Sequence, residues 1–473
     1  MSLAIVGTLL LGLVVPATAA VVESTVADQQ SVAITVYNDG TGLVRDLRTV
    51  MLPLPAQAAT LVWRDVASGI VTQSVSLLDA QPDTALWSVL EQNYRYDLID
   101  QSKLIAKYLG KTVGIAMYDP SLDKTIVKSG TLLSPDVIEI EGKIYPGIPG
   151  QLILPQLPEG LISVPTLEWE LNSPVSSERL VSLSYLTSGM SWQADYVAVV
   201  NADDTALDLN GWTTITNNSG TAYHNAMLKL VAGDVHRVPV AAPVLYPDMV
   251  RKSDMAYPAT VEQLGFEEKS FFEYHLYTLG RPATLLNNEQ KQIALFDPAH
   301  TPALKKFIAD GSSHYWGGDD SQKIDVQVKL EFENKEARGL GMPLPKGTVR
   351  VYKADTDGSL QFIGEDHIEH TPKDETVRLL LGNAFDIKCD RIVAARRQIG
   401  TDIWEYDITV KLRNHKPEPV IVTVVDHVDW GDWSVTKQAG GVYHKKDAST
   451  LEFDVTCAPD VEQVLTYTIR REY

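Results

Sequence analysis

Apolar and polar side chains alternate most regularly over residues 178–235. A first apolar row, at Val181, Leu183 and Tyr185, ends at Gly189, which tolerates the positive φ of a tight turn. Period-two alternation indicates β-strands, because successive strand side chains point to opposite faces. Three further rows of the same kind follow, separated by turns rich in Asn, Asp and Gly. The stretch predicts four antiparallel strands at the spacing of a β-sandwich.

A shorter pattern occurs at four places in the chain. At each, an apolar strand runs into a turn led by asparagine and a second strand returns. The four asparagines are Asn38, Asn217, Asn334 and Asn414. The recurrence favours repeated sandwich modules, but Asn-led turns are so common that a chance similarity is an equal interpretation.

Residues 96–160 interrupt the alternation. They begin with a helical pattern, in which Leu104, Ile105 and Tyr108 lie on one face and Asp100 can cap the first turn. Five short apolar runs follow. A short helix that leads into five small strands is similar to an Sm-like or SH3-like barrel, so we expect an inserted helix plus small barrel here.

Residues 237–270 lose all periodicity and contain four prolines. Burial of their apolar side chains is too small to offset the entropy of ordering so long a segment. This predicts a long mobile loop that orders against a partner or a second copy, with Tyr246, Tyr257 and Phe266 as contact residues. A tightly packed hairpin at this place would contradict the hypothesis.

A second polar loop offers a similar chemistry. Tyr315 and Trp316 lie beside Asp319, and flat rings next to hydrogen-bonding carboxylates suit a sugar or a protein partner. Burial of these rings in the core is the competing interpretation. By contrast, Trp192 and Trp212 are expected to pack in the core.

The whole pattern predicts a mostly-β chain with two or more antiparallel, Ig-like β-sandwich domains. The expected division is given by five ranges: residues 1–20 as a signal peptide, 28–95 as N-terminal strands that can pair with the first sandwich, 96–160 as the helix and barrel, 161–300 as the first sandwich with its long loop, and 323–473 as the C-terminal sandwich.

The first residues carry a targeting pattern. An apolar run at residues 3–15 precedes Ala17-Thr18-Ala19, which resembles the cleavage site of a secretory signal peptide. The run is shorter than the ~20 residues of a membrane span, so no transmembrane span is expected. No Lys or Arg precedes it, and a retained anchor or a buried helix is the alternative. Export to the periplasm, the outer envelope or the medium follows from the main interpretation.

Charge and cysteine content narrow the possible partners. With 41 basic and 61 acidic residues, the formal charge is −20, which opposes binding to nucleic acid. An exported chain with only Cys389 and Cys457 is not built on disulfides. One possible disulfide joins these two cysteines, and two unpaired thiols are the alternative.

Candidate chemistry is sparse. His367 and His370 suggest a metal site, but a strand would send the two rings to opposite faces, so no metal is expected. The sequence contains neither a Gly-x-Ser-x-Gly motif nor a Cys/His pair at a known spacing, so no catalytic residue and no cofactor is predicted.

Several segments resemble a known family. The string SYLTSGMSWQADY in the alternating stretch, FEYHLYTLGRPATL at 272–285, ENKEARGLGMPLPKGTVRVYKAD at 333–355 and LRNHKPEPV at 412–420 are similar to domain-of-unknown-function family 4139. ITVYNDGTGLVRDLRTV at 34–50 and LEQNYRYDL at 90–98 resemble its short members, which lack the coiled coil of mucoidy-inhibitor-like relatives. The resemblance implies a β-rich exported bacterial protein and carries over no catalytic residue.

Together these observations predict a noncatalytic exported envelope protein that acts as a binding or structural module. Its expected partner is an envelope protein or a glycan, and its oligomeric state is open. Two alternatives are an envelope hydrolase with a site assembled between domains and a surface adhesion or oligomerising module.

Overall fold

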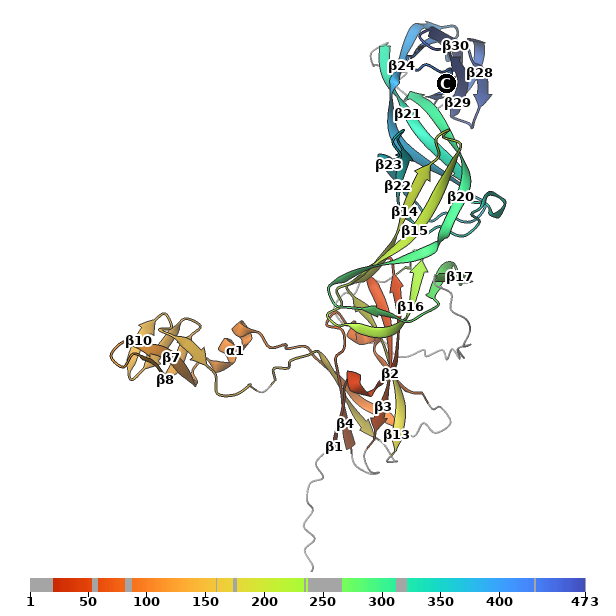
Figure 1. Ribbon diagram of the computed structural model, residues 1–473. Helices are drawn as coiled ribbons and strands as arrows, with labels where there is room; N and C mark the ends of the chain where they lie inside the picture. Colours follow the sequence, from red (N-terminus) through yellow and green to blue (C-terminus); the bar gives the residue numbers. More distant parts are fainter. Residues whose placement is uncertain are drawn as a thin grey trace, which may run out of the picture.

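The computed structural model describes residues 20–52, 58–80, 87–158, 160–172, 177–233, 235–236, 266–311, 321–428 and 431–472. These residues are mostly β, as the alternation predicts, and they form four sheets in an elongated molecule (Figure 1). No helix within these ranges is long and apolar enough to cross a membrane. The expected signal peptide lies outside the described residues except for Ala20, which begins the first strand.

The N-terminal sandwich consists of a four-stranded sheet packed on an eight-stranded sheet. Trp63 and Trp169 of the smaller sheet meet edge to face in its core, with ring centroids 6.4 Å apart. In hydrogen-bonded order, the smaller sheet contains β1 (Ala20–Ser24), β4 (Ala58–Arg64), β12 (Thr166–Asn172) and β6 (Ser88–Arg95). The larger contains β17 (Phe266–Phe271), β18 (Tyr274–Leu279), β16 (Tyr223–Ala232), β2 (Gln29–Tyr37), β3 (Thr41–Met51), β13 (Glu178–Ser188) and β5 (Ser76–Asp79), with β19 (Ala283–Leu285) beside β16.

The alternating stretch forms the four predicted strands, but they do not lie in one antiparallel sheet. β13 pairs with β3 and β5, whereas β14 (Met190–Val200) pairs with β15 (Ala206–Asn217) in another sheet. β16 returns to the first sheet and runs parallel to β2. The chain passes from one sheet to the other at Gly189, where φ is 81°. A Cβ at this position would lie 2.6 Å from the carbonyl oxygen of Asn218, so the turn requires glycine.

The largest sheet, of 13 strands, joins the middle of the molecule to its C-terminal end. Two 23-residue strands, β20 (Glu289–Gly311) and β24 (Thr376–Gln398), run through both parts. The expected boundary between the two sandwiches, at residues 300–323, does not predict that one sheet continues through both. The other strands of the main path are β23 (Leu360–Ile368), β22 (Gly347–Ala354), β14, β15, β21 (Ser321–Glu333), β25 (Ile403–Asn414), β30 (Glu462–Glu472) and β27 (Asp432–Ala439).

Three further strands complete the C-terminal sandwich: β26 (Val420–His427), β29 (Thr450–Cys457) and β28 (Val442–Lys445). Its core contains a buried ion pair, in which Arg391 Nη2 lies 2.9 Å from Asp426 Oδ2. The Tyr467 hydroxyl donates to the same oxygen. Burial and the neighbouring carboxylate of Asp426 raise the pKa of Tyr467, so the phenol stays protonated and donates a hydrogen bond.

The inserted unit projects sideways from the N-terminal sandwich (Figure 1). Its helix α1 (Gln101–Tyr108) is confirmed, and Asp100 caps it by accepting a hydrogen bond from the Lys103 amide. Five strands follow in the order β10 (Lys143–Pro146), β9 (Val137–Ile140), β8 (Lys124–Ser134), β7 (Thr112–Asp119) and β11 (Gln151–Ile153). β10 and β11 lie at opposite edges, so the expected closure into a barrel is wrong: the described strands form an open sheet.

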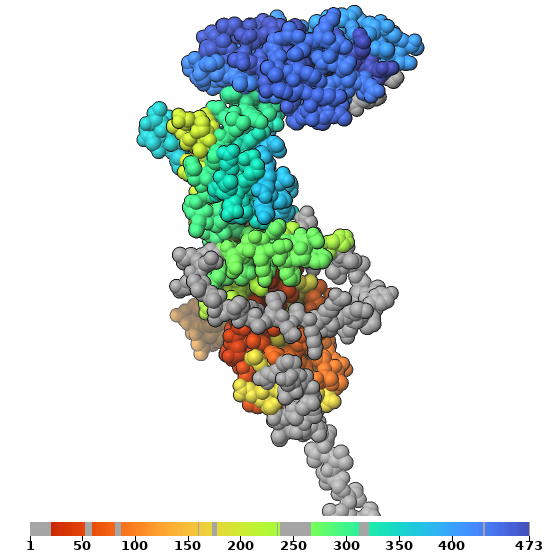
Figure 2. Space-filling view, turned by 90° about the vertical axis from the view of Figure 1, so that its right-hand side faces the viewer, coloured from red at the N-terminus to blue at the C-terminus, as the bar shows by residue number. Residues whose placement is uncertain are grey.

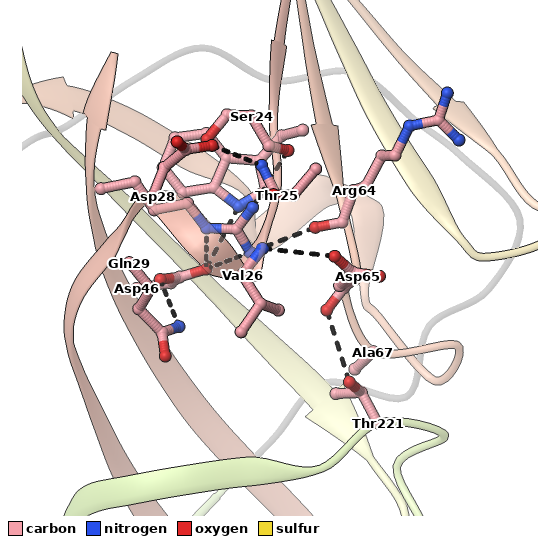
Figure 3. Close-up of polar contacts among 12 residues, drawn as sticks. Ser24, Thr25, Val26, Asp28, Gln29, Asp46, Arg64, Asp65, Ala67 and Thr221 are labelled. Carbon is pink, nitrogen blue, oxygen red and sulfur yellow. Dashed lines mark hydrogen bonds and ion pairs between the residues drawn. The ribbon is translucent and has the colours of Figure 1, made fainter.

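A polar cluster around the buried Arg48 connects strand β1 to β3 and β4. Figure 3 labels Ser24, Asp46 and Arg64 among its residues. Arg48 Nη1 donates to the Ser24 carbonyl at 3.1 Å, and Nη2 donates to the Arg64 carbonyl at 3.1 Å. The guanidinium also contacts Asp46 at 2.8 Å and lies 4.4 Å from the Trp63 ring centroid. The cluster therefore holds β1, β3 and β4 together, and Arg48 at its centre is only 1% exposed.

The prediction of one long loop over residues 237–270 is wrong for its last five residues. Residues 237–265, with Tyr246 and Tyr257, lie outside the described residues. Residues 266–270, however, belong to strand β17, which pairs with β18 through residues such as Phe266 and Leu279. Phe266 packs against the core of the first sandwich, which gives its ring a structural role.

Candidate functional site

The four Asn-led turns differ in how the asparagine side chain is hydrogen-bonded. In three of them the asparagine is buried and both ends of its amide are hydrogen-bonded. Asn217 Nδ2 donates to three carbonyls and its Oδ1 accepts from the Ser219 amide. Asn334 and Asn414 likewise donate to two carbonyls each and accept from one backbone amide. Each side chain therefore ties the end of its strand to neighbouring segments.

Asn38 departs from this arrangement. Its Nδ2 donates to the Trp192 carbonyl at 3.0 Å, but its buried Oδ1 has no hydrogen-bond partner among the described residues. A buried acceptor without a donor costs about 1–3 kcal/mol relative to a satisfied one.

Asn38 lines a cavity of about 310 Å³ between the β2–β3 turn and the largest sheet. We call this cavity the Asn38 pocket. It is lined by Asn38, Ser191, Trp192, Gln193, Ala194, Thr214, Thr216, Gln290, Lys346, Gly347, Thr348 and His367. Most of these side chains are neutral hydrogen-bonding groups, and Lys346 and His367 add two ionisable ones.

Strand register gathers these groups on one face of the sheet. Ser191 lies opposite Thr216, and Gln193 lies opposite Thr214, across the β14–β15 ladder. The odd-numbered residues of β14 face outward because Trp192 and Ala194 fill the core. Alternation predicts this outward polar row, but only the tertiary fold brings the Asn38 turn against it.

Gly347 permits the close approach of the strands at the base of the pocket. β22 runs parallel to β14, with Gly347 opposite Ala194. A Cβ at Gly347 would lie 2.1 Å from the Ala194 carbonyl oxygen. Any larger residue would force the two strands apart and would move Lys346 and Thr348, which lie on either side.

An exposed aromatic ring extends the polar face. Trp212 is 41% exposed, so its predicted core position is wrong, whereas Trp192 is buried as expected. Trp212 and Thr214 are two residues apart on one strand and share its outer face, about 7 Å apart along the strand. Trp212 also lies opposite Asp195, which is hydrogen-bonded to Thr214 at 2.7 Å. The indole is therefore next to the pocket and open to solvent.

The two histidines considered as metal ligands line different cavities. His367 lies on β23 and lines the Asn38 pocket, whereas His370 follows the end of that strand and lines another cavity together with Pro345. His370 Nδ1 accepts a hydrogen bond from the Lys346 amide at 3.2 Å. In the described part of the chain, no group of three His, Cys, Asp or Glu side chains is placed to hold a metal ion.

The remaining candidates from the sequence are not brought to this site. Tyr315, Trp316 and Asp319 lie outside the described residues. Cys389 and Cys457 are buried in the C-terminal core and are not joined by a disulfide. Burial is the largest cause that raises their pKa values, to about 12 and about 11 respectively.

These thiols give a testable expectation. At pH 7 to 8 both remain protonated and inaccessible, and a thiolate is the reactive form. A disulfide-exchange reagent should therefore label neither cysteine in the native protein within minutes, and both once urea has unfolded the chain. Rapid labelling of Cys389 or Cys457 under native conditions would contradict their buried placement.

Comparison with known proteins supports the resemblance seen in the sequence. The family model described as Domain of unknown function (DUF4139) matches residues 181–473, which is more than half of the chain. The match includes β14, β15 and β22, which build most of the Asn38 pocket, whereas Asn38 itself lies before it. A search of curated proteins gives no match. The chain belongs to the DUF4139 family.

Proposed function

We propose that this protein is a noncatalytic, exported envelope component that binds a neutral, hydroxyl-rich ligand, such as a glycan, in the Asn38 pocket. The observation that carries the proposal is a cavity lined by Asn38, whose side-chain oxygen has no hydrogen-bond partner among the described residues. A small shift of this side chain would let a sugar hydroxyl supply the missing donor. The export part of the proposal depends on the signal-peptide pattern at residues 1–20.

The chemistry of the pocket wall supports this ligand class. Hydroxyl groups of Ser191, Thr214 and Thr216 and the amides of Gln193 and Gln290 both donate and accept hydrogen bonds. Sugar hydroxyls do the same, so each can be matched without burying a charge. The exposed ring of Trp212 offers a flat apolar surface on which a sugar ring can lie.

Binding of neutral hexasaccharides tests the proposal. Calorimetric titration with maltohexaose, cellohexaose and chitohexaose should show saturable binding of at least one of them. Gln193→Ala and Gln290→Ala should each weaken that binding about 3- to 10-fold, the value of one net hydrogen bond. Both side chains are exposed, so their removal should leave the fold intact.

The matched control is Gln438→Ala, an exposed glutamine on β27 of the C-terminal sandwich, which should bind like the wild type. Equal affinity of all three variants would contradict the pocket. So would a preference for the anionic hexagalacturonate over every neutral sugar. Release of shorter sugars during the titration would instead support an envelope hydrolase.

A further inference from the structure

A second cavity, of about 290 Å³, opens where the central strands pass into the C-terminal sandwich. Figure 2 shows the narrower region between the central part of the molecule and the broad C-terminal end, where these strands pass. The cavity has an apolar wall and a cationic rim. The residues that matter are Val200, Leu330, Ile363 and Leu381 in the wall and Lys305 and Lys353 at the rim. We call it the lysine pocket.

The pocket lies at the boundary between two hydrophobic cores. Leu330 belongs to the core that the N-terminal and central strands share, and Leu381 packs against this core. Val328, two residues from Leu330, packs instead against the C-terminal core. In the β21–β24 ladder, Lys329 pairs with Leu380 and Val328 with Gly382, so Leu381 is bulged out of the register. The bulge lies where the two cores meet, and the side chains of Leu330 and Leu381 line the lysine pocket there.

The rim carries a net positive charge in a strongly acidic chain. Lys353 Nζ lies 2.5 Å from Asp204 Oδ1, and Lys305 contacts the other carboxylate oxygen. Burial tends to raise the pKa of Asp204, but hydrogen bonds from Lys305 and Lys353 outweigh it and lower the pKa. Two ammonium groups therefore share one carboxylate, which leaves one positive charge. Each ammonium has three N–H donors, so donors remain for a ligand.

We propose that the lysine pocket binds a small amphiphile with a single apolar chain and an anionic head. The head, a carboxylate or a phosphate, would accept hydrogen bonds from Lys305 and Lys353. The chain would lie along Val200, Leu330 and Leu381, where it removes apolar surface from water. A cavity near the lower end of the usual range of small-molecule sites fits one chain of medium length.

This site differs from the Asn38 pocket in chemistry and in position. The Asn38 pocket is lined by hydroxyls and amides at the start of β14, whereas the lysine pocket is apolar and lies at its other end. Val200, the last residue of β14, contributes to it. The two proposals can therefore fail separately.

Titration of the full chain with three decyl ligands below their micelle-forming concentrations tests the inference. Decanoate and decyl phosphate should bind at least ten-fold more tightly than decyl maltoside, which has the same chain and a neutral head. Raising the salt concentration should reduce this preference, because the rim is partly exposed. The relative affinities of decanoate and decyl phosphate distinguish a carboxylate head from a phosphate head.

Variants separate the head from the chain. In Lys305→Gln/Lys353→Gln, the preference for the anionic ligands should fall below about three-fold, while binding of neutral hexasaccharides stays unchanged. Ile363→Trp, at a 37% exposed edge position, should narrow the cavity and weaken all three decyl ligands. Lys446→Gln, which removes a surface ion pair with Glu452, is the matched control.

Three results would overturn the inference. They are equal affinity for decyl maltoside and decanoate, an anionic preference that survives the double lysine substitution, and the failure of every decyl ligand to bind.

Discussion

Asp426→Asn is expected to lower the free energy of unfolding of the C-terminal sandwich by about 3–5 kcal/mol, the usual cost of leaving a buried charge unpaired. Asp426 is fully buried and receives hydrogen bonds from Arg391 and Tyr467. The asparagine has nearly the same volume, so loss of charge is the main change. Cys389 and Cys457 lie in the same core, so thiol labelling along a urea gradient reports its unfolding.

Two further variants define the cause. Glu452→Gln breaks a surface ion pair with Lys446 in the same sandwich and should cost less than about 1 kcal/mol. Replacing the ion pair together with the tyrosine hydroxyl, as Arg391→Met/Asp426→Leu/Tyr467→Phe, should be less damaging than Asp426→Asn alone. The triple variant leaves no buried charge without its counter-charge, although the His427 amide loses its bond to Asp426 Oδ1. Equal urea midpoints for Asp426→Asn and Glu452→Gln would contradict this account of the buried pair.

Asp46→Asn should destabilise the N-terminal sandwich by a similar amount, about 3–5 kcal/mol. The substitution leaves the guanidinium of Arg48 without its carboxylate, in a core that excludes water. It also weakens the acceptor for the Trp63 indole, which donates to Asp46 Oδ2 at 3.2 Å. Since Arg48 also holds the carbonyls of Ser24 and Arg64, β1 and β4 should loosen first.

Hydrogen exchange measured on peptides from β1 and β4 checks this expectation. Protection there should fall in Asp46→Asn, while peptides of the C-terminal sandwich stay unchanged. Glu23→Gln is the control, because Glu23 forms an exposed ion pair with Arg64 on the same two strands. If the peptides of β1 and β4 lose as much protection from exchange in Glu23→Gln as in Asp46→Asn, the buried cluster does not stabilise these strands more than the surface ion pair does.

The sequence predicts strands well and their partners poorly. The β2–β3 hairpin follows from alternation around a tight turn, because both strands are local. The path at Gly189 does not, since alternation states which face is buried and not which strand lies alongside. Asp46 and Arg48 show a second limit: both are polar, yet their positions alternate with Val44 and Val50 on the buried face. Only a compensating ion pair makes that arrangement stable.

The candidate site was only half visible in the sequence. The four Asn-led turns stand out as a recurring pattern, and in three of them the asparagine is fully hydrogen-bonded. The difference at Asn38 arises from contacts with Trp192, which is 154 residues away. Trp212 is predicted in the core, but the alternation that buries Gly211 and Thr213 sends its ring outward. The contact between Asn38 and Trp192, by contrast, leaves no local signal.

A crystal structure of the protein soaked with its best-bound neutral oligosaccharide tests the central claim most directly. We expect a sugar between Asn38 and His367, with one hydroxyl about 2.7–2.8 Å from Asn38 Oδ1 and a sugar ring near Trp212. A sugar bound elsewhere on the molecule, with the Asn38 pocket holding only solvent, would contradict it.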